Sequence, residues 1–411
     1  MHLDKRILMF GLGYSIVISF SLFGPIQQVI YGDLSFIHSI ISLLAFIFVF
    51  ATPVFHKLSK SILVTSLFSS MIMIMFGLYP YFSTMIFAFS IAAVCRYFTL
   101  HVFHLGEAEV EMSKAFFIAF MILYFLNVTV PDLSVIASKV VLLLLVSVLT
   151  LVLSYQDFLD MTTMETKKGS TKISNVALLL IYIGGGITYA GIYPHFEAFS
   201  YVDRFYNVLP FIITMPIAAY VGKKHGNIYN LYFGVLSLCL AFVSFLFDHT
   251  IFNYFITQTC LQIGWGFVNV FGFAYSWTLA KKSDYPQAFG NGLVFILVGV
   301  FIGSIISLTL EDAGVPVVFF APFTFIPIVI SLIIFSHPTV YSNNIPSRDE
   351  DNFLNVLTKR EKEIVMMYLE GSTSDVAEKL FISNNTVKTH VKHIYKKLNV
   401  SSKDELRELF E

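Results

Sequence analysis

The chain has 411 residues, of which 56% are hydrophobic and 13% charged, and its formal net charge is −1. Soluble domains contain about 25% charged residues, so this composition excludes a protein that is soluble along its whole length. The near-zero net charge says nothing about partners, because it averages two regions with different charge balance. Residues 1–336 consist of long apolar runs, whereas 347–411 have the composition of an ordinary soluble domain.

The first apolar run follows Lys5 and Arg6 and is longer than the hydrophobic region of a secretion signal, which predicts a retained transmembrane helix. A helix needs about 20 apolar residues to cross a bilayer, and lipid disfavours irregular spanning segments. Twelve segments of the chain meet this requirement. They are 7–31, 34–54, 61–79, 81–103, 114–131, 133–154, 174–194, 205–222, 228–247, 251–279, 286–309 and 314–336.

The distribution of basic residues predicts the orientation of these helices, because cytoplasmic loops are rich in lysine and arginine. With the N-terminus inside and one crossing per segment, the inside loops contain Lys5, Arg6, Lys57, Lys60, Lys114, Lys167, Lys168, Lys172, Lys223, Lys224, Lys281 and Lys282. The outside loops contain Arg204 together with the acids Asp33, Asp132, Asp203, Asp248, Glu311 and Asp312. We therefore predict a multi-pass protein of a cytoplasmic membrane, with both termini in the cytoplasm.

The longest polar break in this region, SYQDFLDMTTMETKKGSTK at 154–172, divides the predicted helices into six and six. The expected membrane domain 1–336 thus has halves of about 1–154 and 173–336, joined by a cytoplasmic loop at 155–172. This arrangement resembles the major facilitator superfamily, whose halves are related by an axis along the membrane normal.

One family motif is incomplete in this chain. Transporters of that superfamily carry a Gly-x-x-x-Asp-(Arg/Lys)-x-Gly-(Arg/Lys)-(Arg/Lys) loop between helices 2 and 3. The loop here is ATPVFHKLSK, which has neither the glycine nor the aspartate. The matching loop AAYVGKKHGN keeps Lys223, Lys224 and Gly226 but also lacks the aspartate. This departure argues against transport.

Ionisable residues within membrane segments are candidates for function, because each costs at least ~2.5–3.5 kcal/mol there. Arg96 lies well inside the fourth segment and either holds an anionic signal or extends its charge to the inner interface. We expect every Asp and Glu of the region to lie in a loop or at a helix end, which leaves no carboxylate for proton coupling. Cys95, Cys239 and Cys260 lack metal-ligand spacing, so we expect no metal site and no cofactor.

The seventh segment, IYIGGGITYAGIYPHFEAF, has two interpretations. Three successive glycines at 184–186 weaken a helix, so it is either a hinged helix lining a pocket open to the outside or a helix in close contact with its neighbours. Polar and aromatic residues of the later segments are further pocket candidates. The candidate ligand-sensing residues are Arg96, Tyr189, His195, Glu197, Trp265 and Asn269.

Residues 337–351 are polar and contain Pro338 and Pro346, which predicts a linker ahead of a small domain at 352–411. Thr358 and Glu361 have the spacing of a capping box, which indicates a helix that begins there and ends at Gly371. The further helices are expected to start at Ser372 with Asp375, at about 386 after a tight turn at 383–385, and at Ser401 or Ser402.

The third of these helices, in SNNTVKTHVKHIYKKL, is amphipathic and basic. Val387, Val391, Ile394 and Leu398 recur at spacings of 4, 3 and 4 and form one apolar face. The other face carries Lys388, Thr389, Lys392 and Lys396. A short helix, a tight turn and a helix with a basic outer face predict a helix-turn-helix that enters the major groove of DNA. The alternative is a solvated face of a small bundle.

The order Leu-Thr-x-Arg-Glu-x-Glu, Glu-Gly and Val-Ala-Glu-Lys-Leu-Phe-Ile-Ser-x-x-Thr-Val-Lys-Thr-His-Val resembles the LuxR/NarL family of bacterial DNA-binding domains over 357–410. The loop between Gly371 and Val376 is one residue shorter than usual. The resemblance implies that Lys388, Thr389 and Lys392 face base edges and that Thr386, Lys396 and Lys397 lie near phosphates. It also implies a homodimer on double-stranded DNA through the helix at 402–410.

Together these patterns predict an all-α protein with a twelve-helix membrane bundle and a four-helix DNA-binding domain. The sequence shows no receiver-domain, kinase or Walker pattern, and we expect no enzyme. We expect a membrane-bound one-component regulator of a bacterium, in which a small molecule of unknown identity acts on the bundle and the tail binds promoter DNA. A transporter with a fused regulatory tail and a ligand-free membrane anchor remain as alternatives.

Overall fold

The computed structural model describes residues 5–21, 24–52, 60–101, 107–154, 172–247, 250–282, 287–336, 357–380, 382–398, 400 and 402–408. The chain divides into two compact units, 1–344 and 345–411. Every regular element in the described ranges is a helix, which confirms the predicted all-α class. The predicted linker 337–351 and nearly all of the predicted loop 155–172 lie outside these ranges.

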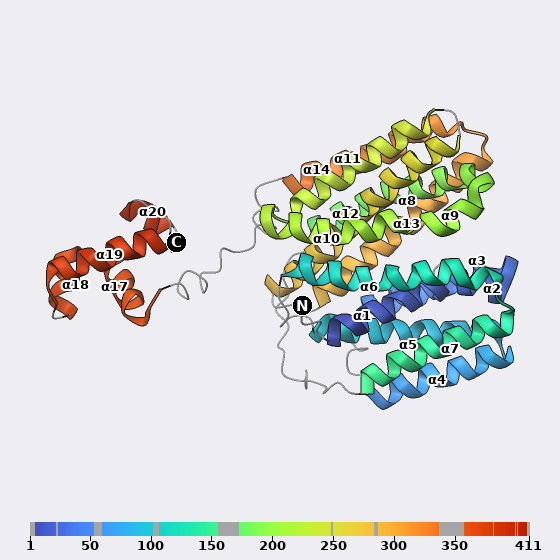
Figure 1. Ribbon diagram of the computed structural model, residues 1–411, viewed down its shortest axis with the longest axis horizontal. Helices are drawn as coiled ribbons and strands as arrows, with labels where there is room; N and C mark the ends of the chain where they lie inside the picture. Colours follow the sequence, from blue (N-terminus) through green and yellow to red (C-terminus); the bar gives the residue numbers. More distant parts are fainter. Residues whose placement is uncertain are drawn as a thin grey trace. The chain divides into compact units, whose positions relative to one another are not determined.

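The first unit contains two groups of helices, which Figure 1 shows in blue to teal and in green to orange. The first group comprises α1 (Lys5–Ile16), α2 (Pro25–Tyr31), α3 (Ser35–Ala51), α4 (Lys60–Phe76), α5 (Pro80–His101), α6 (Ala108–Thr129) and α7 (Val135–Ser154). The second comprises α8 (Lys172–Ile192), α9 (Ser200–Tyr206), α10 (Leu209–His225), α11 (Ile228–Phe245), α12 (Ile251–Lys282), α13 (Gln287–Asp312) and α14 (Ala321–Ser336). Short π and 3₁₀ turns occur at Val17–Ser21 and Tyr193–Phe199.

Each of the twelve predicted segments contains a helix, but the described part of this unit has fourteen, because the first segment is interrupted and one short helix lies mostly outside the predicted segments. The first segment breaks into α1 and α2 ahead of Pro25, whose ring nitrogen has no hydrogen to donate to a preceding turn. The additional helix α9 lies mostly in the predicted outside loop before the eighth segment, and that segment forms α10, with Pro210 in its first turn. Seven described stretches are long and apolar enough to cross a membrane, so twelve crossings remain a prediction.

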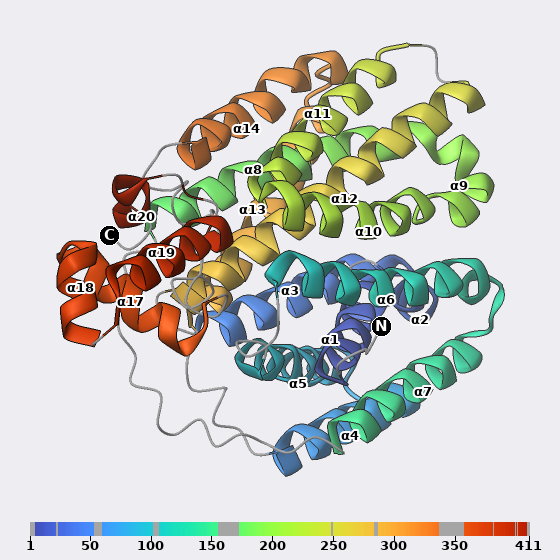
Figure 2. The ribbon, with the colours of Figure 1, turned by 60° about the vertical axis from the view of Figure 1, so that its left-hand side comes forward.

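The two groups meet through reciprocal helix pairs. The helix α3, in the second predicted segment, packs against α13, in the eleventh. In the same way, α6 of the fifth segment packs against α10 of the eighth. Figure 2 shows α6 beside α10. Contacts within the groups repeat in the same way, because α3–α5 and α4–α5 correspond to α10–α12 and α11–α12. Such pairing is expected of two similar halves related by a two-fold axis.

The second unit has four helices, namely α17 (Lys359–Glu370), α18 (Thr373–Leu380), α19 (Asn384–Leu398) and α20 (Lys403–Glu408). It has its own hydrophobic core, in which all four residues of the apolar stripe predicted on α19 are buried. That core is formed by Leu357, Ile364, Val365, Val376, Ala377, Val387, Val391, Ile394, Leu398 and Leu406.

Candidate DNA-binding surface and membrane cavity

Reciprocal side-chain caps hold α18 and α19 in a helix-turn-helix arrangement. The N–H of Ser372 donates to Asp375 Oδ2 at 2.7 Å, and the N–H of Asp375 donates to Ser372 Oγ at 3.3 Å, which starts α18. The hydrogen bond from the Ser372 N–H also lowers the pKa of Asp375. At the next turn, Ser383 Oγ accepts the N–H of Thr386 at 3.1 Å, and the Asn384 side chain donates to Ser374 Oγ of α18 at 3.1 Å.

Glu361 connects the start of α17 to α19. Its carboxylate accepts the backbone N–H of Thr358 at 2.8 Å, and the Thr358 hydroxyl accepts the N–H of Glu361 at 3.3 Å, which confirms the predicted capping box. The same Oε2 atom accepts Lys397 Nζ at 2.6 Å. Burial alone would raise the pKa of Glu361, but the hydrogen bonds from Lys397 and Thr358 outweigh it and lower that pKa to about 2.

The outer face of α19 presents uncompensated positive charge. Lys388, Thr389 and Lys392 are exposed, and within the described residues the two lysines have no hydrogen bond or ion pair. The Thr389 hydroxyl donates to the Asn385 carbonyl at 3.0 Å, and that of Thr386 lies 2.8 Å from Ser383 Oγ at the start of the helix. These positions can reach base edges and phosphates without breaking an internal ion pair.

The remaining residues of the predicted interface have different surroundings. Lys397 points back to Glu361, so its ammonium group is already engaged inside the domain. The side chain of Lys396 lies outside the described structure. Ser402 Oγ accepts the N–H of Glu405 at 3.1 Å and caps α20, and this identifies which of two predicted serines starts the fourth helix. Dimerisation through 402–410 remains a prediction.

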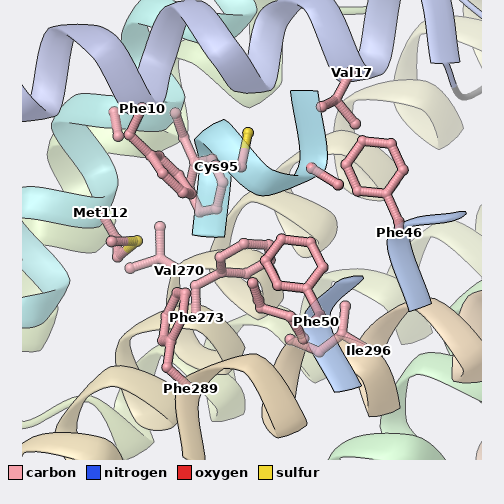
Figure 3. Packing of buried hydrophobic residues seen from close by; sticks show 14 of the residues in the cluster. Phe10, Val17, Phe46, Phe50, Cys95, Met112, Val270, Phe273, Phe289 and Ile296 are labelled. Atoms are coloured by element: carbon pink, nitrogen blue, oxygen red, sulfur yellow. The ribbon is translucent and has the colours of Figure 1, made fainter. Parts of the chain in front are cut away.

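A cavity of about 760 Å³ lies between the two halves of the first unit. Its wall includes residues of α1, α3 and α6 on one side and of α8, α10, α12 and α13 on the other. It extends to Gln28, Phe36 and Leu308, close to the predicted outside loops. Phe10, Phe50 and Phe273 also line it, and Figure 3 shows Phe10 and Phe50 packed near Phe273 and Phe289 of the other half.

The three glycines of α8 allow three neighbouring helices to approach closely. A Cβ atom on Gly184 would lie 2.5 Å from the Thr324 carbonyl oxygen of α14. A Cβ on Gly185 would lie 2.3 Å from the Trp265 ring of α12, and one on Gly186 would lie 2.5 Å from the carbonyl oxygen of residue 300 in α13. Because α8 continues without a break from Lys172 to Ile192, the structure supports close packing rather than a hinge.

The structure brings two of the six ligand-sensing candidates to this cavity. Trp265 and Asn269 line it, and the Tyr182 hydroxyl donates to Asn269 Oδ1 at 3.3 Å. His195 is exposed and stands edge-on to Phe245, with 5.3 Å between ring centroids, and it is not among the described lining residues. The side chains of Arg96, Tyr189 and Glu197 lie outside the described structure.

Asp203 lies in the first turn of a short helix, at a helix end as expected, but the sequence did not predict its burial. It lies within α9, its residue is 7% exposed, and it lines the cavity. Tyr254 donates to its Oδ1 at 2.7 Å and the Asn207 amide to its Oδ2 at 3.1 Å. The polar residues Tyr254, Gln258 and Gln262 recur every four positions along α12. That spacing within an apolar helix is the sequence signal that would have found this cluster.

Comparison with known proteins agrees with this geometry. Residues 355–410 match the family model described as bacterial regulatory proteins, luxR family. The tail is a LuxR-family helix-turn-helix domain. It is similar to the oxygen regulatory protein NreC of Staphylococcus epidermidis, with 50% identity over 54 residues, which are 13% of this chain and 25% of that protein. It also resembles the transcriptional regulatory protein LiaR of Bacillus subtilis, with 50% identity over 48 residues, or 11% and 23% of the two chains.

The chain therefore spans about a quarter of the length of these curated relatives, all of it within the LuxR-family domain. Solved structures match the rest. The transporter FucP in its outward conformation covers 81% of this chain and 98% of its own, with 14% identity and a TM-score of 0.56. The human organic anion transporter MFSD10 covers 81% and 97%, with 12% identity and a TM-score of 0.60. These likenesses show that the first unit has the major facilitator fold.

Proposed function

We propose that this protein is a membrane-embedded transcriptional regulator in which the helical bundle senses a small molecule and the LuxR-family domain binds promoter DNA. The observation that carries the proposal is one chain with both a LuxR-family domain and a bundle with a sizeable cavity. A ligand that prefers one bundle conformation by about 1–3 kcal/mol would shift the population of DNA-binding states. Both termini are then cytoplasmic, and the bundle lies in the inner membrane of a bacterium.

The proposed interface follows the exposed face of α19. Lys388, Thr389 and Lys392 contact base edges in the major groove, and Thr386, Lys396 and Lys397 lie at the phosphate backbone. Two copies bind paired half-sites through the helix at 402–410. In support, the lysines at 388 and 392 are exposed and have no internal partner in the described structure.

The test uses the full chain in lipid nanodiscs and DNA fragments recovered with it by chromatin capture. Lys388→Ala and Lys392→Ala should each weaken binding to the recovered fragments. Lys362→Ala is the matched control, because it removes the same charge from α17 instead of α19. Unchanged binding in both α19 variants would remove the assigned docking face. A reporter fused after Glu411 that is active outside the cytoplasm would refute the proposal as a whole.

One observation favours a second candidate function, a working transporter with a fused regulatory tail. A buried carboxylate, Asp203, lines the cavity, and coupled transport commonly uses such a group. The incomplete loop motifs at ATPVFHKLSK and AAYVGKKHGN argue against it. Accumulation of a solute by reconstituted vesicles, lost in Asp203→Asn, would establish transport and displace the sensor proposal.

A further inference from the structure

The polar end of the cavity is organised around Asp203. Gln258 donates its Nε2 to Asn207 Oδ1 at 2.5 Å, and Gln262 donates to the same oxygen. Asn207 in turn donates its own amide to Asp203. The side-chain amides of Gln258 and Gln262 therefore donate to Asn207, whose own amide donates to the Asp203 carboxylate. Gln262, which also lines the cavity, has its carbonyl oxygen left to accept a hydrogen bond from a ligand.

The cationic side chain in the described wall is turned away from this cluster. Arg204 donates from Nε to the Val128 carbonyl at 3.0 Å and from Nη1 to Asp132 Oδ1 at 3.0 Å. Its charge is therefore balanced by Asp132 on the other half of the bundle. Among the described lining residues there is no other lysine or arginine, so the polar wall offers oxygen acceptors and a carboxylate.

The rest of the wall is aromatic. Phe120 of α6 stacks on Phe211 of α10 with 3.8 Å between ring centroids, and Tyr14 of α1 meets Phe273 of α12 edge-on at 5.9 Å. Trp265 adds a fifth ring. Aromatic faces attract cations and cover the apolar body of a ligand. The cavity volume of about 760 Å³ lies in the range of small-molecule sites.

We infer that this cavity binds an organic cation with an aromatic or apolar body, its positive group directed to Asp203 and Gln262. The inference rests on the proposed function, because it names the chemical class of the signal that the bundle senses. Both the carboxylate and the ring faces stabilise positive charge, and either one repels an anion of the same size.

The test uses a matched pair of probes, tetraphenylphosphonium and tetraphenylborate, which share size and shape but have opposite charge. Trp265 and Trp277 are the two tryptophans of the sequence, so in full-length Trp277→Phe in lipid vesicles, which contain no other protein, the emission reports on the cavity wall. Tetraphenylphosphonium should change that emission saturably, and tetraphenylborate should not. Adding Asp203→Asn should weaken phosphonium binding by about tenfold or more.

Asp33→Asn is the control, because Asp33 is exposed and carries the same charge at the same predicted end. It should leave phosphonium binding unchanged. Equal binding of the two probes, or equal affinity in Asp203→Asn, would overturn the inference. If Asp203→Asn does not fold, the comparison of the two probes in Trp277→Phe still decides. Promoter binding is measured separately, so a cavity that rejects cations leaves the DNA-binding proposal standing.

Discussion

Lys397 of α19 donates to Glu361 of α17, with 2.6 Å between Nζ and Oε2. The Glu361 side chain is 5% exposed, whereas that of Lys397 is 36% exposed. Because the same carboxylate caps α17, one residue fixes both the start of the first tail helix and the position of the recognition helix. This contact relates the stability of the tail to its DNA-binding geometry.

Glu361→Gln should therefore destabilise the tail more than a comparable surface change. Glutamine can still close the capping box, but it loses the charge-assisted bond to Lys397, at a cost of about 1–2 kcal/mol. Hydrogen exchange of α17 and α19 amides in the full chain measures the loss. Glu363→Gln is the control, since its pair with Arg360 is about equally exposed on both sides and such pairs contribute ~0–1 kcal/mol. Equal loss of protection in both variants would contradict the assignment.

The tail should also lose stability in acid in a defined window. Burial acts to raise the pKa of Glu361, yet the bonds from Lys397 and Thr358 lower it to about 2, below the ordinary value of about 4.3. A depressed folded-state pKa gives stability that is fully present above about 4.3 and is lost as the pH falls toward 2. Exchange protection of α17 should fall in this window, and Glu361→Gln should flatten the decline. An unchanged profile in the variant would assign the acid sensitivity to other carboxylates.

The lysines of α19 should differ in their contribution to salt-dependent DNA binding. Lys392 has no ion-pair partner in the described structure, whereas Lys397 must leave Glu361 to reach a phosphate. Lys392→Met should reduce the magnitude of the slope of log affinity against log salt by about 1 if its charge, held at a base edge in the major groove, displaces one counterion from the DNA. Lys397→Met should change this slope less. Titrations with one recovered promoter fragment at several salt concentrations measure the slopes of both variants. A larger change of slope in Lys397→Met than in Lys392→Met would contradict the prediction.

The sequence predicted the tail more completely than the cavity, for a physical reason. The Thr358–Glu361 cap and the stripe of Val387, Val391, Ile394 and Leu398 depend on contacts a few residues apart, which spacing reveals. Segment hydropathy likewise located a helix in each of the twelve regions. The burial of Asp203 depends on contacts between distant helices, such as that with Tyr254. The spacing of Tyr254, Gln258 and Gln262 marks a polar face on α12, but it does not specify which residue of another helix meets that face.

The contact between Gly185 and Trp265 predicts a packing defect. An added Cβ would lie 2.3 Å from the indole ring, whereas Gly13 would place one 3.2 Å from a single atom, Cys95 Sγ. Gly185→Ala should therefore lower the melting temperature of the nanodisc-bound chain, because overpacking costs about 1–3 kcal/mol and exceeds the gain in helix propensity. Gly13→Ala is the control and should melt near the wild-type temperature. A hinge at 184–186 would give the opposite result, since alanine would stiffen and stabilise α8.

The ion pair of Arg204 with Asp132 joins the two halves at the predicted outer end, and its two members should not be equivalent. Asp132 is 73% exposed and Arg204 is 18% exposed, so solvent screens the pair and its charge attraction alone contributes little. Arg204 also donates to the Val128 carbonyl at the end of α6. Replacing Arg204 leaves the Val128 carbonyl without this hydrogen bond, whereas Asp132→Asn preserves the bond. Arg204→Gln should therefore loosen the outer contact more than Asp132→Asn.

Electron–electron distance measurements can test this asymmetry. Spin labels at Ile136 of α7 and Phe252 of α12 occupy exposed positions on opposite halves, near the predicted outer loops. In a chain freed of its three cysteines, Arg204→Gln should broaden the distance distribution toward longer values, and Asp132→Asn should remain close to the parent. Equal shifts in both variants would mean that the ion pair, rather than the carbonyl contact, holds the halves together. No shift in either would place the restraint in the α6–α10 packing below it.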